Sequence, residues 1–325
     1  MDKGFMEKCD VLDRLEPDKY QRSAKYKFKL RISNDQLGDT VYVPVILIRG
    51  SGPGPRVTIT AAIHGDELNG SFLCYQMADL IKPEDLAGDL VLVPIINVQA
   101  FKAKRREYID GTDLNRVMPG KRNGLPGEVF AYNFFHKVIL GTNFLFDLHT
   151  ASKGRINTLY SRVNLDMPAV RDLIKYQRTP LVLHASDKKS KTLRKAAEEN
   201  GITALTIEIG NPNIYQKKYV REILTGLLHC MQDGIKVLKT NKDYDFIEKQ
   251  ICRSSQWLRT KKGGLLEVEA ELYEQVYEGQ RVAVIRDAFG HVIQEYFAPH
   301  DGVVIGLDRN PVSIPGDRII HLGKN

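Results

Sequence analysis

Four short apolar runs in the first two thirds of the chain constrain the fold more than any other feature. They are Val57–Ile63, Leu90–Ile96, Asn143–Phe146 and Ala204–Ile207. Uninterrupted runs of this length are typical of strands that are buried on both faces of a sheet. Segments with helical spacing lie between them, including Leu193–Asn200. Strands that alternate with helices predict an α/β sheet covered on both faces.

The pattern changes near residue 250. From Trp257 onward the chain reads as short strands separated by glycine-containing turns such as Gly263-Gly264 and Glu278-Gly279. Short strands at this spacing predict a small all-β module. We therefore expect a catalytic domain at residues 1–250 and a C-terminal β domain at residues 251–325. Within the first domain, residues 1–25 carry no clear structural signal, and 220–238 is expected to form one long amphipathic helix.

Composition limits the classes of partner. The chain has 325 residues, 42% of them hydrophobic and 27% charged, which is ordinary for a soluble globular protein. No apolar run approaches the roughly 18 residues of a membrane span. The charged segment Met1–Lys27 lacks the apolar stretch of a secretory signal, so we expect a cytoplasmic protein without a membrane partner. The sequence leaves a homo-oligomer open.

The net charge of +7 raises the question of nucleic acid. The basic cluster at 102–106 is short, and no nucleic-acid recognition motif accompanies it. We therefore expect no nucleic-acid partner. A cationic cleft would also attract a small anionic substrate, which is the partner we predict.

The tetrapeptide His64-Gly65-Asp66-Glu67 follows the first of the apolar runs directly. An imidazole and a carboxylate three positions apart can hold one divalent metal, and a strand end is where an open α/β sheet binds its ligands. Gly65 would let the backbone turn there. His149, which follows the run ending at Phe146, is the expected third ligand. Two histidines and one carboxylate leave one position open, as in catalytic zinc sites.

Other interpretations of these residues remain. His149 could instead cap the next segment by hydrogen bonding, and Asp147 could orient a ligand or act as a structural acceptor. Glu208 lies within Thr206-Ile207-Glu208-Ile209-Gly210, where a buried carboxylate is costly without a task. It is the expected general acid and base for a zinc-bound water. The alternative for Glu208 is a buried salt bridge.

The segment Asp113-Leu114-Asn115-Arg116 supplies groups suited to a substrate carboxylate. Asn115 offers an amide, and Arg116 offers a planar guanidinium that can bind a carboxylate through two hydrogen bonds. Upstream, Arg105 or Arg106 could stabilise an oxyanion that forms beside the metal. Each arginine taken alone could equally form a surface ion pair.

Together these motifs resemble the succinylglutamate desuccinylase and aspartoacylase family, which is related to the zinc carboxypeptidases. The resemblance covers residues 40–325 and implies a zinc-carboxypeptidase-like mixed sheet flanked by helices, with a smaller C-terminal all-β domain. It implies a zinc-dependent amidohydrolase that cleaves a small N-acyl amino acid or related N-acyl amine. Carried over by motif, one zinc ion (Zn2+) per subunit would be bound by His64, Glu67 and His149, with Glu208 as the acid and base.

The same resemblance implies that Asn115 and Arg116 hold the substrate carboxylate and favours Arg106 over Arg105 as the oxyanion arginine. Met118 stands where many relatives carry an aromatic residue, a departure that would alter the shape of the pocket. Just past His149, Arg155 and Asn157 are expected to line the pocket on the acyl side, although a loop ion pair explains Arg155 equally well.

The C-terminal module resembles barrel-sandwich folds that carry lipoyl or biotinyl groups on a lysine at a hairpin tip. The expected tip here, residues 287–291, has no lysine, so we interpret the module as a lid that favours small substrates. Partner binding and oligomerisation are the alternatives for it. For the whole chain, the competing functions are a zinc carboxypeptidase acting on peptide-like substrates and a noncatalytic scaffold that retains the fold.

Overall fold

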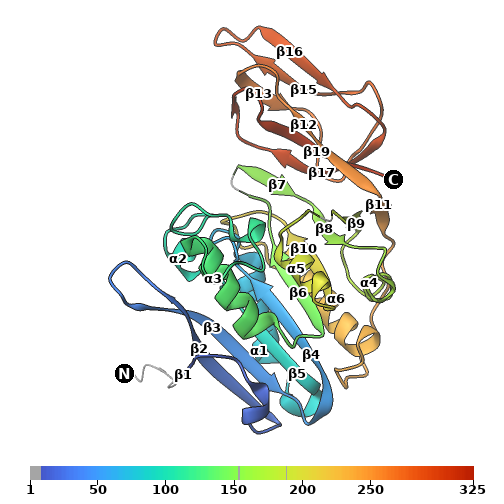
Figure 1. The fold of residues 1–325 in the computed structure, drawn as a ribbon. Coiled ribbons are helices and arrows are strands. Elements are labelled where there is room, and N and C mark those ends of the chain that lie inside the picture. Colours follow the sequence, from blue (N-terminus) through green and yellow to red (C-terminus); the bar gives the residue numbers. More distant parts are fainter. Residues whose placement is uncertain (1–8, 153, 188) are drawn as a thin grey trace, which may run out of the picture.

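A computed structural model describes residues 9–152, 154–187 and 189–325 (Figure 1). Residues 1–8 of the N-terminal segment therefore lie outside the described part of the chain. A large sheet with helices on both faces forms the body of the molecule, and a smaller region built from strands stands at one end of it (Figure 1). No helix in the described ranges is long and apolar enough to cross a membrane.

The large sheet contains ten strands. In spatial order they are β1 (Asp10–Leu12), β2 (Ala24–Asn34), β3 (Thr40–Arg49), β5 (Ala87–Val93), β4 (Gly52–Ala61), β6 (Phe144–His149), β10 (Thr203–Ile209), β8 (Leu159–Val163), β9 (Leu181–His184) and β11 (Gln250–Cys252). The central strands β5, β4, β6 and β10 are parallel, whereas β3 and β8 run antiparallel to their central neighbours. The sheet is therefore mixed, as the resemblance to the family implies.

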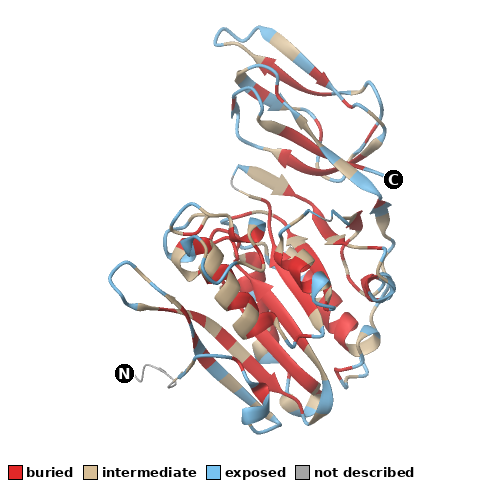
Figure 2. Ribbon diagram, in the orientation of Figure 1, coloured by how far each residue is buried: buried red, intermediate tan, exposed pale blue. Residues whose placement is uncertain are grey.

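In the described part of the chain, six α-helices cover the two faces of this sheet. They are α1 (Asn69–Leu80), α2 (Val98–Lys102), α3 (Pro126–Phe134), α4 (Pro168–Ile174), α5 (Leu193–Glu199) and α6 (Lys217–His229). Helices α1, α4 and α6 contribute to one buried cluster, and α2, α3 and α5 contribute to a second. Successive side chains of a strand point to opposite faces, so the central strands supply both clusters (Figure 2). This arrangement explains why their sequences are mostly apolar.

Short helical turns complete the body. Three are 3-10 turns, η1 (Pro17–Lys19), η2 (Pro83–Asp85) and η3 (Leu114–Arg116), and two are π turns, η4 (Phe135–Ile139) and η5 (Cys230–Gly234). The prediction of a single helix over 220–238 is wrong at the C-terminal end. α6 ends at His229 and continues only as η5, because Lys236 adopts a positive φ and Leu238 then pairs with Leu86.

The C-terminal region consists of two antiparallel sheets around a buried core. One sheet contains β12 (Ser254–Arg259), β19 (Arg318–Lys324), β17 (Gly302–Asp308) and β14 (Gln275–Val276), and the other contains β16 (Val292–Phe297), β15 (Arg281–Arg286), β13 (Gly264–Val268) and β18 (Val312–Ser313). Their inward side chains form a third apolar cluster. The prediction of an all-β C-terminal region is confirmed.

Two short strands connect this region to the body. β7 (Arg155–Asn157), which follows His149 in the chain, pairs with β17 and so becomes an edge strand of a C-terminal sheet. β11 lies at the far edge of the large sheet, where it pairs with β9. The boundary expected at residues 250 and 251 falls within β11 and remains a proposal. The pairing of β7 fixes the loop after His149 against the β region.

Candidate active site

The predicted ligands and the predicted base gather at the carboxyl ends of three adjacent parallel strands. His64 and Glu67 lie in the turn that follows β4, and His149 is the last residue of β6. Glu208 is the penultimate residue of β10 and pairs in register with His149. Because β4, β6 and β10 are neighbours, residues that are far apart in the sequence meet at one edge of the sheet.

Gly65 has a different task from the one expected. Its φ lies outside the left-handed region, and the residue of this turn with a positive φ is Ala62. A Cβ atom on Gly65 would lie 2.1 Å from the backbone carbon of Ala100. The glycine is therefore required because α2 passes directly against the turn, and this contact holds the His64–Glu67 segment in place.

His64, Glu67 and His149 form a compact cluster of metal-ligating groups, and their ligand atoms lie within 4.8 Å of one another. Nδ1 of His64 is 2.8 Å from Oε1 of Glu67, and Nδ1 of His149 is 3.0 Å from Oε2 of Glu67. All three side chains are buried. Nδ1 of His64 has no hydrogen-bond partner despite its short distance to Glu67, so the two groups are not oriented to bond with each other. A metal ion bound to both groups would satisfy this nitrogen.

The other nitrogen of each histidine is held by a carboxylate. Nε2 of His64 lies 3.1 Å from Asp113, and Nε2 of His149 lies 2.9 Å from Asp147. A carboxylate on the far side of the ring fixes the orientation of the imidazole and is the usual arrangement around metal-binding histidines. His149 therefore does not cap the next segment. Two imidazoles and one carboxylate are a donor set that fits zinc, so this cluster could bind a metal.

Neighbouring groups of opposite charge keep the carboxylates of the cluster ionised. Burial alone would favour the neutral form of Glu67, but His64 and His149 outweigh it and lower the pKa of Glu67 well below its ordinary value. Burial is likewise outweighed at Asp113, where His64 and Arg106 lower the pKa of the carboxyl. Both carboxylates are thus held in the ionised form that a metal ligand or its supporting acceptor requires.

The two candidate oxyanion arginines point to different places. Arg106 donates through Nη1 to Glu67 (2.8 Å) and Ser152 (2.8 Å), and through Nη2 to Asp113 (2.9 Å). Arg105 donates to the backbone carbonyl of Tyr108 (3.0 Å) and does not line the cavity. Only Arg106 therefore lies beside the metal-ligating cluster.

Glu208 is half-buried and faces the cavity. Its Oε2 accepts a hydrogen bond of 3.4 Å from Nδ2 of Asn157. Within the described ranges no lysine or arginine forms an ion pair with it, so the salt-bridge alternative finds no partner there. Burial raises the pKa of Glu208, His149 opposes this change and Glu67 adds to it. A carboxyl with a raised pKa is suited to accepting and returning a proton.

The turn η3 presents Asn115 and Arg116 to the same cavity. Asp113 caps this turn by accepting a hydrogen bond from the backbone of Asn115 (2.9 Å). The side-chain oxygen of Asn115 accepts from the backbone of Leu193 (2.7 Å), which leaves its amide nitrogen facing His149 at 3.5 Å. Arg116 is anchored through one nitrogen to the carbonyl of Asn115 (2.9 Å). Met118, in contrast, is buried in the core and does not line the cavity, so the effect expected on pocket shape is not seen.

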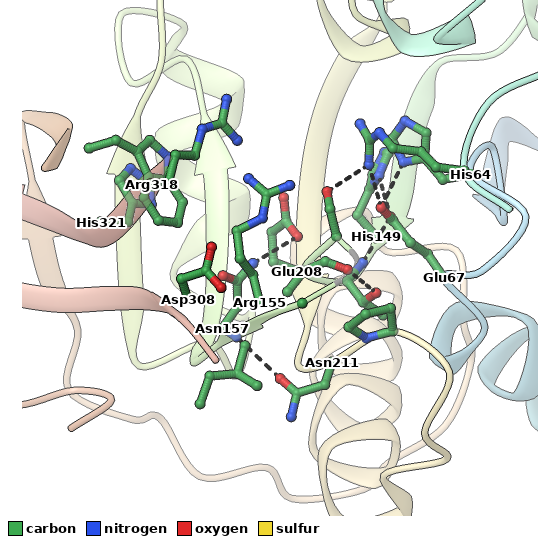
Figure 3. Close-up of a pocket in the computed structure, with 18 of the residues that line it drawn as sticks. His64, Glu67, His149, Arg155, Asn157, Glu208, Asn211, Asp308, Arg318 and His321 are labelled. Carbon is green, nitrogen blue, oxygen red and sulfur yellow. Dashed lines mark hydrogen bonds and ion pairs between the residues drawn. The ribbon is translucent and has the colours of Figure 1, made fainter. Parts of the chain in front are cut away.

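One cavity of about 1160 Å³ is lined by His64, Glu67, Arg106, Asn115, Arg116, His149 and Glu208 (Figure 3). Arg155 and Asn157 also line it, and Figure 3 places them between Glu208 and the C-terminal strands. Part of the wall comes from the β region and includes Trp257, Arg318 and His321. Sequence reasoning missed these three residues because no motif marks them and they are far from the metal-ligating segments in the chain. The one indication that the β region would reach the cavity was the interpretation of the C-terminal module as a lid.

The chain is similar in sequence to known proteins. The family model of the succinylglutamate desuccinylase/aspartoacylase catalytic domain matches residues 53–233. An N-alpha-acetyl-L-2,4-diaminobutyric acid deacetylase of Halomonas elongata is 28% identical over 308 residues, which cover 90% of this chain and 88% of that protein.

Solved structures extend the similarity to the whole fold. A product-bound ectoine utilization protein from Ruegeria pomeroyi superimposes with a TM-score of 0.85 at 23% identity, covering 94% of this chain and 97% of that one. A succinylglutamate desuccinylase/aspartoacylase from Rhodobacter sphaeroides gives a TM-score of 0.83 at 23% identity, covering 96% and 97%. The resemblance noted in the motifs is thereby confirmed, and the chain belongs to the succinylglutamate desuccinylase/aspartoacylase family.

Proposed function

We propose that this protein is a zinc-dependent hydrolase that cleaves the amide bond of a small N-acyl amino acid or related N-acyl amine. The observation that carries the proposal is the convergence of His64, Glu67 and His149 with Glu208 in one cavity. Membership of the family and the similarity to a deacetylase support the reaction class. We further propose a cytoplasmic enzyme that has no nucleic-acid partner and whose C-terminal β region restricts access to small substrates.

The three ligating residues would hold one zinc ion per subunit. Bound zinc supplies a Lewis acid for the amide carbonyl and lowers the pKa of its water from 15.7 toward about 7. The protein's own contribution at this point is orientation. Asp113 and Asp147 fix the two imidazoles, and the buried carboxylate of Glu67 remains ionised between them.

Glu208 would carry the proton. Its carboxylate faces the cavity from the strand next to His149, so it is positioned to take a proton from the attacking water and return it to the leaving nitrogen. Asn157, which donates to Oε2 of Glu208, holds the carboxylate in that orientation. The raised pKa of Glu208 favours this exchange because the group must bind the proton and then release it.

The remaining groups would orient the substrate. Arg106 would stabilise the negative charge that develops on the carbonyl oxygen. The amide of Asn115 and the guanidinium of Arg116 would bind the carboxylate of the amino-acid part, and Arg155 would line the acyl side. Holding the substrate at both ends makes the attack effectively intramolecular.

The substrate class can be tested with a panel of zinc-loaded reactions. We expect release of free amine from N-acyl amino acids and at least about tenfold lower kcat/KM for peptides of three or more residues, because the β region closes one side of the cavity. Mass spectrometry of both products measures this directly. Cleavage of peptides in preference to N-acyl amino acids would favour a carboxypeptidase, and no hydrolysis with metal bound would favour a noncatalytic scaffold.

The oxyanion assignment can be tested by comparing two neighbouring arginines. We expect Arg106→Gln to lower kcat by about 10²–10³-fold, the usual effect of removing one oxyanion donor. Arg105→Gln is the matched control, since the side chain of Arg105 donates to the carbonyl of Tyr108 and does not line the cavity. Metal content must be measured in both variants because Arg106 also contacts Glu67. Equal losses of kcat in the two variants would contradict the assignment.

A further inference from the structure

Two rows of side chains cross the neighbouring strands β6, β10 and β8 beside the metal-ligating cluster. The members of a row are register partners on adjacent strands: the first row is His149, Glu208 and Tyr160, and the second is Asp147, Thr206 and Arg162. Residues two positions apart in a strand point to the same face, and partners on adjacent strands lie side by side. Glu208 therefore lies between a candidate ligand, His149, and a tyrosine, Tyr160, that has no role in the proposed mechanism.

Each end of the first row is held by a member of the second. Asp147 lies 2.9 Å from Nε2 of His149. On the other side of Glu208, Arg162 donates through Nη2 to the hydroxyl oxygen of Tyr160 (3.0 Å). A guanidinium group has donors and no acceptor, so the tyrosine must be the acceptor in this bond. The proton of the Tyr160 hydroxyl remains available for a different group.

Glu208 is the group that receives this hydrogen bond. Burial raises the pKa of Tyr160, Arg162 opposes the change, and a side-chain hydrogen bond with Glu208 adds to it. The tyrosine therefore stays a neutral phenol that can donate to a carboxylate. Together with Asn157, whose Nδ2 lies 3.4 Å from Oε2, Tyr160 gives Glu208 donors from two different strands.

The ring of Tyr160 is fixed by contacts with the C-terminal β region. Tyr160 is 2% exposed, and the ring of His321 on β19 meets it edge-on, with centroids 6.4 Å apart. Its other apolar neighbours come from β8's neighbour β9, from β11 and from β17, and they are Leu181, Leu183, Cys252, Val303 and Ile305. A ring packed on all of these strands has little freedom to turn, so the direction of its hydroxyl is set before a substrate binds.

We propose that Tyr160 is a positioning residue for Glu208, held by Arg162 at its hydroxyl and by the β region at its ring. This inference rests on the proposed function and adds a residue that orients the base. Donors from Tyr160 and Asn157 limit the rotation of the carboxylate, so it is already directed into the cavity when proton transfer begins. The β region would then support the reaction by holding Tyr160, in addition to restricting access.

The first test removes the hydroxyl and keeps the ring. We expect Tyr160→Phe to lower kcat about tenfold, as for the loss of one hydrogen bond to a charged group, and to leave KM within about threefold of the wild type. Tyr296→Phe is the matched control. Tyr296 is also buried and its hydroxyl accepts from the backbone of Lys261 (2.7 Å), but it does not line the cavity, so this variant should keep the wild-type kcat.

The second test asks whether Tyr160 acts through Glu208. In a Glu208→Gln background, Tyr160→Phe should change kcat by less than about twofold, because positioning has no effect once the transferring carboxylate is gone. A general structural role would lower kcat by the same factor in both backgrounds.

The part of Arg162 is tested by conservative rescue. Arg162→Met is expected to lower kcat about tenfold, and Arg162→Lys to recover most of the loss, because lysine keeps a positive charge and a donor for the Tyr160 hydroxyl. An increase in KM with unchanged kcat in Arg162→Met would contradict the positioning role of Arg162 and assign it to substrate binding.

The third test observes the contact without catalysis. The protein is labelled with 13C at the ring carbon that carries the tyrosine hydroxyl, and the resonance of Tyr160 is identified by its absence in Tyr160→Phe. In the metal-loaded protein, Glu208→Gln should shift the Tyr160 resonance because it removes a charged acceptor, and should leave the resonance of Tyr296 unchanged.

These measurements separate the positioning role from the reaction. A shift of the Tyr160 resonance without any amide hydrolysis by the wild type would support the contact and reject the proposed function. Hydrolysis by the wild type with undiminished kcat in Tyr160→Phe, or with equal losses in the two backgrounds, would overturn the positioning role and leave the proposed function standing. An unshifted Tyr160 resonance in Glu208→Gln would overturn the contact itself.

Discussion

Glu208→Gln is expected to lower kcat by about 10²–10⁴-fold, the range observed when a general acid or base is removed. The glutamine keeps the size of the side chain and can still bond to Asn157, so the loss reports on proton transfer alone. Metal content should equal that of the wild type, because Glu208 is not one of the clustered ligating groups. Steady-state kinetics on a responsive N-acyl amino acid, with metal analysis of the same sample, measure both quantities.

The control for this variant is a second carboxylate that lines the same cavity. Glu107 lines the cavity and is partly exposed, but it belongs to the segment next to Arg106 and not to β10. Glu107→Gln should retain kcat within about threefold, a change of less than 1 kcal/mol in the barrier. If Glu107→Gln and Glu208→Gln were equally impaired, the loss would reflect the charge of the cavity, and Glu208 would not be the base.

Replacing His149 with glutamine is expected to abolish both metal binding and activity. The substitution removes one of the three ligands, and the loss of the Lewis acid should lower kcat/KM by about 10³-fold or more. Glu67→Gln should have the same effect, since the carboxylate lies between both histidines. Metal content after dialysis against a fixed zinc concentration, together with circular dichroism to confirm folding, measures the result.

Another buried histidine of the cavity provides the comparison. His321 lines the cavity, but it stacks on Trp257 and bonds to Ser255, away from the ligating cluster. His321→Gln should therefore keep its metal while His149→Gln loses it. A folded His149→Gln protein that still bound zinc with wild-type affinity would show that the cluster is not the metal site.

The core of the fold and of the site was predictable because local sequence and global topology agree there. Strands β4, β6 and β10 are mostly apolar since helices cover both faces, and the candidate ligands and base lie at or just past their carboxyl ends. In a parallel sheet, strand ends lie at one edge, so His64, His149 and Glu208 could be expected to meet. The candidate ligands and the candidate base could thus be identified as polar residues that interrupt or directly follow the apolar runs.

Other features were set by contacts that no local pattern records. The choice between Arg105 and Arg106 depends on which side chain the turn directs toward Asp113, and the spacing allows either. The need for a glycine at Gly65 comes from the backbone of α2, which lies against it. Likewise, the helical segment that continues α6 ends with η5, and Leu238 then pairs with Leu86, which is distant in the sequence.

The largest omission was the wall contributed by the β region. Pairing between β7 and β17 joins a short loop after His149 to strands more than a hundred residues further along the chain. β7 has only three residues, and although β17 contains an apolar run, no local pattern marks these two strands as partners. This pairing also brings Arg155 of β7 to 5.7 Å from the ring centroid of Trp257, a contact that no local pattern predicts.

Removal and restoration of zinc in the wild-type protein tests whether the cluster of His64, Glu67 and His149 is a catalytic zinc site. The protein is stripped with a chelator, titrated with zinc, and assayed for release of free amine from an N-acyl amino acid. We expect that the stripped protein is inactive, that activity returns in proportion to bound zinc, and that it saturates at about one ion per chain, the number that the His64, Glu67 and His149 cluster can hold. Full amide hydrolysis by the stripped protein, or a zinc-loaded protein that hydrolyses no N-acyl amino acid, would contradict it.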